Sequence, residues 1–272
     1  MAEVIIIVGI GANVMKESEI IRNKIRNGSF VGQTSGLAEG FAQANLVVLE
    51  ESEARDFLLF VQRNPKPCPL LEVTDVGSPY TRYVAQNADL RTDIPKYRVY
   101  IKGELVDEPT DILKYWREDL VAFLLGCSFS FEWALIEAGI PIRHIEAKRN
   151  VPMYKTNIET KRAGIFHGPL VVSMRPIPYD KVVKATTITS RFPNVHGAPV
   201  HIGYPELIGI TDLNSPDYGD KPVIKEGDIP VFWACGVTPQ AVAIESKVNF
   251  MITHSPGHMF ITDIKNSELS IF

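Results

Sequence analysis

The chain has 272 residues, of which 45% are hydrophobic and 22% charged, and its formal net charge is −4. This length and composition are typical of a soluble globular protein that forms one large domain or two small ones around a full hydrophobic core. The lack of excess positive charge argues against a general nucleic-acid binder and against binding to an anionic membrane surface, which leaves a small molecule or a protein as partner.

Helix and strand patterns alternate through the first third of the chain. Glu17–Asn27 is predicted as a helix that ends at Gly28. Ser52–Gln62 is predicted as a second helix, because its apolar residues recur at helical spacing. Leu70–Thr74 and Tyr97–Ile101 are predicted as strands.

Two helices and two long apolar runs follow. Asp111–Leu125, with Thr110 as its N-cap, and Ser130–Ala138 are predicted as helices. Leu170–Met174 and Ile229–Ala234 are continuously apolar, and such runs are typical of strands buried on both faces in α/β sheets.

The last part of the chain predicts one helix and two short strands. Thr238 is a good N-cap, and Pro239 suits the first helical position. Phe250–Thr253 and Met259–Thr262 are the strands. The whole order of elements predicts the α/β class, with mixed sheets arranged in two lobes.

Cysteine usage and the N-terminal segment predict a cytoplasmic protein. Cys68, Cys127 and Cys235 are odd in number and widely spaced, so they predict neither a disulfide framework nor a zinc site. The apolar run Val4–Ile10 is shorter than a spanning helix and has no basic segment before it. Glu3–Val8 is interpreted as a buried strand or an extension of the chain.

Five stretches hold polar residues in unusual density among glycines and prolines. We expect them to fold together into one crevice at the mouth of a sheet, beside Thr238. The stretches are Gly32–Gly36 with Gln43 and Asn45, Arg63–Pro69, Gly126–Glu132, Arg191–Tyr204, and Cys235–Gln240 with His254–His258.

Several strings that run through these stretches resemble the D-glutamate cyclase family, whose bacterial members are usually labelled hydro-lyases. The resemblance extends from about Arg22 to Asp263. One departure is Tyr204-Pro205, where the family is expected to carry Asp-Pro after the HIG string. The matching strings are RNPKPCPLLEVTD from residue 63, GCSFSFEWAL from 126, GPLVVSMRP from 168, SRFPNVHGAPVHIG from 190, IPVFWACGVTPQ from 229, and ITHSPGHMFITD from 252.

The resemblance implies a fold and a reaction. The fold is a three-layer αβα main domain, here 14–110 plus 190–272, with a smaller two-layer α+β domain at 111–189. The reaction is the cyclisation of D-glutamate to 5-oxo-D-proline with loss of water, a carbon–oxygen lyase reaction. It implies no redox or nucleotide cofactor.

Four residues are candidates for proton transfer in such a reaction. His201 and His258 lie in loops with backbone donors and could act as a general base near neutral pH. Cys235 could be a nucleophile or a small buried hydrophobic residue. Glu132 could carry a proton, or it could serve only as a favourable charge in the first turn of its helix.

Eight further residues are candidates for substrate binding, because a dicarboxylate needs cations, amides or helix-terminus donors. Each also has a structural interpretation, such as a helix cap, a surface ion pair or a turn. They are Thr238, Arg175, Arg191, Asn45, Asn64, Lys66, His196 and His254.

Other sites are not favoured by the sequence. Gly9-Ile10-Gly11 follows an apolar run, but Val14 stands where a dinucleotide fold needs a third glycine. The histidines of HSPGH lie in a Pro/Gly loop without the helical spacing of a zinc protease, so no metal is predicted.

Two other functions stay open beside D-glutamate cyclisation. One is a lyase or hydrolase for another small acid, which Tyr204 in place of an acidic residue favours. The other is a protein that binds a small acid without catalysis. The sequence does not determine whether the chain forms a homo-oligomer.

Overall fold

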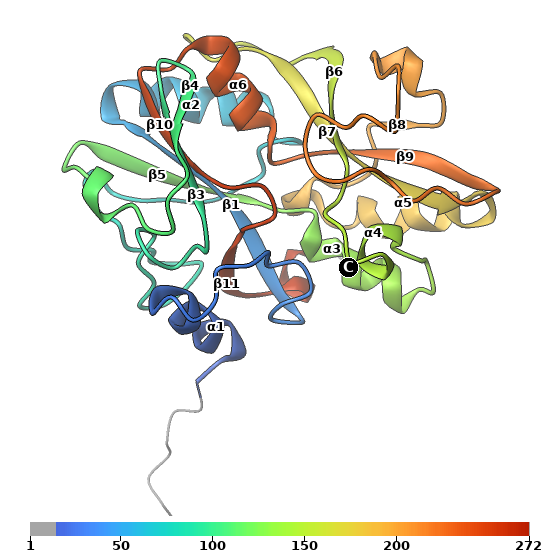
Figure 1. Ribbon diagram of the computed structural model, residues 1–272, viewed down its shortest axis with the longest axis horizontal. Helices are drawn as coiled ribbons and strands as arrows, with labels where there is room; N and C mark the ends of the chain where they lie inside the picture. Colours follow the sequence, from blue (N-terminus) through green and yellow to red (C-terminus); the bar gives the residue numbers. More distant parts are fainter. Residues whose placement is uncertain (1–14, 272) are drawn as a thin grey trace, which may run out of the picture.

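The computed structural model describes residues 15–271, and the predictions at Glu3–Val8 and Gly9–Gly11 lie outside this range (Figure 1). The described strands form two sheets. The larger has seven strands in the order β2-β5-β1-β10-β3-β4, with β11 paired to β1. Its strands are β1 (Phe41–Glu50), β2 (Leu70–Val73), β3 (Tyr97–Ile101), β4 (Glu104–Asp107), β5 (Leu120–Gly126), β10 (Phe250–His254) and β11 (Phe260–Lys265).

The smaller sheet has four strands in the order β6-β7-β9-β8, and Figure 1 shows it beside the larger one. Its strands are β6 (Met153–Glu159), β7 (Pro169–Pro178), β8 (His201–Ile202) and β9 (Asp228–Ala234). Strands β6 to β9 come from residues 153–234, and the predicted domain division at 111–189 stays a prediction.

Every strand pair in both sheets is antiparallel. The protein is therefore a mixed α+β fold, and the predicted α/β class, with its three-layer αβα main domain and smaller two-layer α+β domain, is wrong. The α/β class was predicted from apolar runs that are typical of parallel strands, whereas the three-layer arrangement was implied by the family resemblance. An antiparallel sheet produces the same runs when both of its faces are covered.

The larger sheet is buried on both faces. Ala44, Leu46 and Val48 of β1 belong to one hydrophobic cluster, whereas Val47 and Leu49 belong to another. Because successive side chains of a strand point to opposite faces, the two clusters lie on opposite sides of the sheet. The expected elements do not include β1, in which Gln43 and Asn45 interrupt the apolar pattern.

Six α-helices surround the sheets in the described part of the chain, and Figure 1 shows α6 at the top and α1 at the bottom. Within a few residues they confirm the helices predicted at 17–27, 52–62, 130–138 and from 238. The helices are α1 (Glu17–Arg26), α2 (Glu51–Arg63), α3 (Phe129–Glu137), α4 (Arg143–Glu146), α5 (Val182–Ser190) and α6 (Thr238–Ser246).

The predicted helix at Asp111–Leu125 is wrong. Only Leu113–Tyr115 forms a short 3-10 helix, and Leu120–Gly126 is strand β5. All seven residues of β5 are buried, so the apolar run reflects burial in the middle of a sheet rather than one face of a helix.

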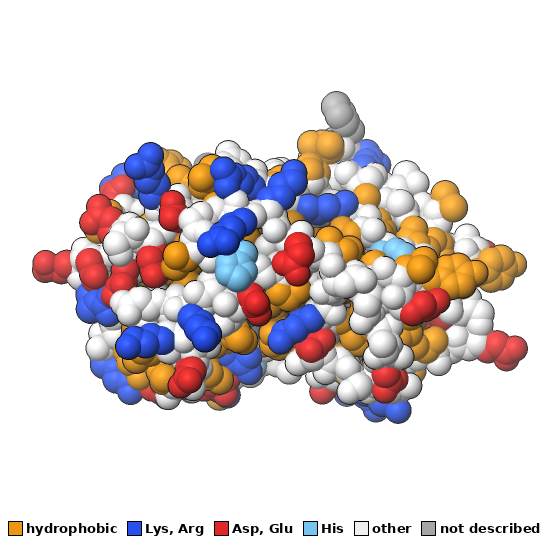
Figure 2. All heavy atoms as spheres, turned by 90° about the horizontal axis from the view of Figure 1, so that it is seen from above, with side chains coloured by type: hydrophobic (Ala, Val, Ile, Leu, Met, Phe, Trp, Pro, Cys, Tyr) orange, Lys and Arg blue, Asp and Glu red, His pale blue; other side chains and the backbone are white. Residues whose placement is uncertain are grey.

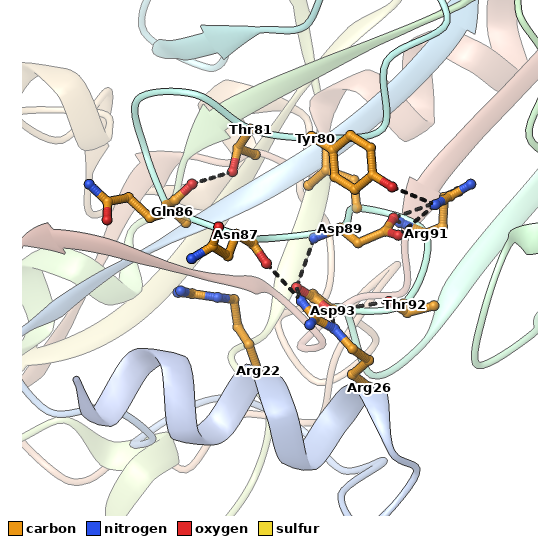
Figure 3. A network of polar contacts seen from close by, with 12 residues as sticks. Arg22, Arg26, Tyr80, Thr81, Gln86, Asn87, Asp89, Arg91, Thr92 and Asp93 are labelled. Carbon is orange, nitrogen blue, oxygen red and sulfur yellow. Dashed lines mark hydrogen bonds and ion pairs between the residues drawn. The ribbon is translucent and has the colours of Figure 1, made fainter. Parts of the chain in front are cut away.

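A polar network attaches α1 to the larger sheet (Figure 3). The buried Arg22 donates to Ile261 O at 2.9 Å and to Asp263 at 2.8 Å. Arg26 makes a two-pronged ion pair with the buried Asp93, at 2.7 and 2.6 Å. These bonds also fix the position from which the chain runs on to β1.

Two further features are the distribution of charge on the surface and the length of the helices. On the face drawn in Figure 2, acidic and basic side chains are interspersed, which is typical of a globular protein. None of the helices in the described part of the chain has the length and apolar character needed to cross a bilayer.

Candidate active site

Three of the polar stretches meet where the two sheets join. Asn45 on β1 donates its side-chain amide to Gly126 O, at the end of β5, over 2.8 Å. A Cβ atom on Gly236, directly after β9, would overlap the amide of Asn45. Glycine is therefore required at that position, because the backbone passes directly against the amide group.

The stretches around Lys66 and His196 join the same junction. Nδ1 of His196 lies 2.8 Å from Lys66 O, so Nδ1 carries the proton and donates it to the carbonyl. A Cβ on Gly126 would overlap the carbonyl of Asn194. The Lys66 side chain is half-buried, and burial lowers its pKa.

A fully buried arginine lies at the centre of this junction. Arg175 on β7 donates to Oε1 of Glu132 through Nε at 2.9 Å and Nη2 at 2.5 Å. It also donates to the hydroxyls of Ser128 and Ser173, each at 3.0 Å. Arg175 therefore joins the smaller sheet to α3, and Glu132 already neutralises its charge.

Glu132 has a second partner that sequence reasoning missed. Nε2 of the buried His144, on α4, lies 3.3 Å from Oε1 of Glu132. Burial acts to raise the pKa of Glu132, but Arg175 and His144 together lower it to about 2. The residue is therefore an anion at neutral pH, and no sequence motif marks His144 as its partner.

The cysteines of the junction are free and buried. Burial raises the pKa of Cys127 to about 12 and that of Cys235 to about 11. Both are therefore thiols rather than thiolates near neutral pH, which weakens them as nucleophiles. The predicted catalytic role of Cys235 stays a prediction.

The HSPGH loop joins β10 to β11 and is held by the Gly32–Gly36 stretch. Thr34 N donates to Gly257 O at 2.8 Å, and Met259 N donates to the hydroxyl of Thr34 at 2.9 Å. The half-buried His258 has Nδ1 3.0 Å from Pro256 O. Burial lowers the pKa of His258, so its imidazole is neutral near pH 7.

Lys96 and Glu108 act on the charge of this histidine, and Arg98 is bound to the same carboxylate. Arg98 on β3 donates to Glu108 at 2.6 Å, and Lys96 lies 3.4 Å from the same carboxylate. Ser255 contributes a hydroxyl that donates to Glu108 at 3.4 Å. Arg98, Lys96 and Glu108 together therefore carry one excess positive charge.

Tyr218 connects this face to Cys235. Burial raises the pKa of Tyr218 to about 12. Tyr100, Asp217 and Cys235 act in the same direction, whereas Arg98 acts to lower this pKa. The phenol therefore stays protonated and can donate a hydrogen bond. Sequence reasoning missed Arg98 and Tyr218, because a polar residue in a strand and a tyrosine in a loop carry no specific signal.

Two other predicted residues make structural contacts. The hydroxyl of Thr238, at the start of α6, donates to Cys235 O at 2.7 Å and accepts from Val171 N at 3.2 Å. The Asn64 side chain donates to Phe60 O and accepts from Lys161 N, both at 2.8 Å. Their substrate-binding roles stay predictions.

The remaining candidates lie apart from one another. His201 on β8 donates Nε2 to Tyr204 O at 3.0 Å. The buried His254 on β10 accepts a hydrogen bond at Nδ1 from Leu46 N at 3.2 Å. Arg191 follows α5 and lines a separate hollow of about 700 Å³. The structure thus brings most of the five stretches together, but not all of their candidate side chains.

The described residues contain no group of three His, Cys, Asp or Glu side chains that could hold a metal ion.

Two buried histidines predict that the protein loses stability in acid. Burial lowers the pKa values of His196 and His254 to about 4 each. Because the unfolded chain takes up these protons near pH 6.5, lowering the pH from about 6.5 to 4 should reduce the free energy of unfolding by about 3 kcal/mol for each histidine.

Urea unfolding of the wild type and of His196→Asn, each at pH 7 and pH 4.5, measures this loss. Asparagine keeps a donor toward Lys66 O and tolerates the positive φ of residue 196. The variant should lose less stability between the two pH values than the wild type. Equal losses would show that His196 does not titrate in this range.

The junction thus offers a neutral imidazole, cations and a protonated phenol, which are the groups that an enzyme for a small acid needs. Comparison with known proteins is consistent with this class. Residues 121–263 match the family model described as D-glutamate cyclase. A protein of Thermoanaerobacter sp. (strain X514), named "Putative hydro-lyase", is 65% identical over 256 residues, covering 94% of this chain and 96% of its own.

Similar relatives occur in other bacteria. Proteins with the same name are 61% identical in Geobacillus kaustophilus, over 93% of this chain and 97% of theirs, and 59% identical in Bacillus licheniformis, over 95% and 98%. The chain belongs to the D-glutamate cyclase family. This confirms the predicted family and agrees with the predicted class of carbon–oxygen lyase.

Among solved structures, a nitrogen repressor-like protein from Methanococcus jannaschii aligns over 90% of this chain and 97% of its own, with 10% identity and a TM-score of 0.37. These values are too low to infer a shared fold.

Proposed function

We propose that the protein cyclises D-glutamate to 5-oxo-D-proline, with release of water, at the face that carries His258, Arg98 and Lys96. Family membership supports the reaction class. The observation that carries the proposal is that a neutral histidine lies beside the group of Arg98, Lys96 and Glu108, which carries one excess positive charge, and that Ser255 of the HSPGH loop contacts this group. The ligand matches this charge, since two carboxylates and one ammonium leave it with one negative charge.

The chemistry requires a base before anything else. The ammonium nitrogen loses a proton, attacks the γ-carboxyl carbon and forms the new C–N bond. One C–O bond then breaks, and the oxygen leaves as water with the two protons that the nitrogen has lost. The neutral imidazole of His258 accepts the first proton and can return it to the departing oxygen.

The neighbouring groups bind and stabilise charge. Arg98 and Lys96 hold the carboxylates. The phenol of Tyr218 and the thiol of Cys235 stay protonated, and we propose that they donate to the oxyanion that forms on the γ-carboxyl group. Glu132 is held as an anion by Arg175, and we propose that it fixes the arrangement of the junction.

His201 is the second candidate for the base. It lies on β8 of the smaller sheet, beside Tyr204, which stands where the family is expected to carry an acidic residue. The Tyr204 side chain is 72% exposed. A base at His201 would favour the other candidate function, a lyase or hydrolase for another small acid.

Incubation of the purified protein with D-glutamate, followed by chiral detection of 5-oxoproline, tests the proposal. We expect 5-oxo-D-proline to accumulate, with little product from L-glutamate. Turnover of another small acid but not of D-glutamate would establish the other lyase function. Thermal stabilisation by D-glutamate without any product would establish a binding protein instead.

A further inference from the structure

A cavity of about 440 Å³ lies beside α3, and its lining includes neither His258 nor Arg98. Its wall is formed by α3, by residues 36–41, which lead into β1, and by Asn266 after β11. This volume is within the range of small-molecule sites in proteins. The proposed reaction makes no use of the cavity itself.

The described lining of the cavity is acidic and aromatic. Its ionisable side chains are Glu39, Glu132 and Glu137, and no Lys, Arg or His belongs to it. Arg175 neutralises Glu132, so an excess of negative charge comes from the other two. Phe129 and Trp133 present rings, and aromatic faces attract cations.

Two buried side chains of the lining carry an acceptor without a partner. Gln43 and Asn266 are 4% and 5% exposed, and neither Oε1 of Gln43 nor Oδ1 of Asn266 has a hydrogen-bond partner. The orientation of Gln43 is set, because its Nε2 donates to Thr34 O at 2.8 Å. A buried acceptor without a donor is costly, so a ligand that brings N–H groups would relieve that cost.

We propose that this cavity binds an organic cation, namely a primary ammonium group on a small apolar body. The ammonium supplies the donors that Gln43 and Asn266 lack, and the carboxylates of the lining balance its charge. The apolar body lies against Phe129, Trp133 and Ile136. Nζ of Lys265 lies 3.5 Å from the centre of the Phe41 ring, so this ring already has a cation. The rings of Phe129 and Trp133 remain for the ligand.

This ligand differs from the proposed substrate. D-glutamate carries two carboxylates, which the acidic lining would repel, whereas the excess positive charge near His258 attracts them. The cavity is therefore a second site, and the result of the D-glutamate assay neither supports nor excludes it.

Calorimetric titration with three molecules of similar shape tests the proposal. The probes are 2-phenylethylamine as the cation, 2-phenylethanol as its neutral equivalent and 3-phenylpropionate as an anion. We expect the amine to bind at least about tenfold more tightly than the alcohol, because a hydrogen bond from a charged donor is stronger than one from a neutral donor, and we expect the anion not to bind. Equal affinities for amine and alcohol, or no binding of the amine, would overturn the proposal.

Two variants locate the site. Asn266→Leu should weaken binding of the amine by about tenfold, while the stability of the ligand-free protein stays equal or rises, because an unpaired buried acceptor is removed. Glu137→Gln should also weaken binding, whereas Glu226→Gln, an exposed carboxylate outside the cavity, should not. Unchanged affinity in Asn266→Leu would overturn the assignment to this cavity.

Discussion

Replacing Arg175 by methionine is expected to lower the free energy of unfolding by about 3–5 kcal/mol at neutral pH, because it leaves the buried Glu132 without its main counter-charge. The arginine is fully buried and makes two hydrogen bonds to Oε1 of Glu132. Two serine hydroxyls also lose their partner. Urea unfolding at pH 7 measures the effect.

Two controls separate this buried pair from ordinary surface charge. Arg82→Met removes an exposed ion pair with Asp75 and should change stability by only about 0–1 kcal/mol. The double variant Arg175→Met with Glu132→Leu should recover part of the loss, since no uncompensated charge then remains buried. If Arg175→Met costs no more than Arg82→Met, the Arg175–Glu132 pair does not hold the junction together.

Replacing His258 by asparagine is expected to reduce kcat for D-glutamate by about 10²–10⁴-fold, because general base catalysis contributes a factor of that size. Asparagine can keep a polar contact with Pro256 O but cannot accept a proton. Since the proposed function assigns carboxylate binding to Arg98 and Lys96, KM should change much less than kcat. Steady-state kinetics on both variants of the base, His258→Asn and His201→Asn, provide the comparison.

The pH profile gives an independent readout of the same residue. Burial lowers the pKa of His258 below its ordinary value of about 6.5. As the pH is lowered from neutral, kcat/KM of the wild type should therefore stay constant at first. It should fall only below about pH 6.5, where the imidazole takes up a proton. The variant should lack this acid limb. A large loss of kcat in His201→Asn but not in His258→Asn would move the base to the smaller sheet.

Local structure followed well from the sequence, but the direction of strands did not. The strands at 97–101 and 229–234 and the helix at 130–138 are where the apolar patterns predict them. Strands β7 and β9 pair antiparallel although they lie far apart in the chain. The apolar run of each strand predicts that it is buried, but not the direction in which it pairs. The run at 120–125 was also ambiguous, because burial on both faces removes the period that separates strand from helix.

The same division applies to the candidate site. The sequence by itself determined the family and the polar stretches, because long specific strings of Gly, Pro and polar residues can be recognised from the order of residues alone. Only the tertiary structure decided the environment of each side chain: the pairing of Arg175 with Glu132, the neutral state of His258, and the partners Arg98, Tyr218 and His144. The physical reason is that charge state depends on burial and on neighbours within a few ångströms, and these neighbours come from strands that are distant in sequence.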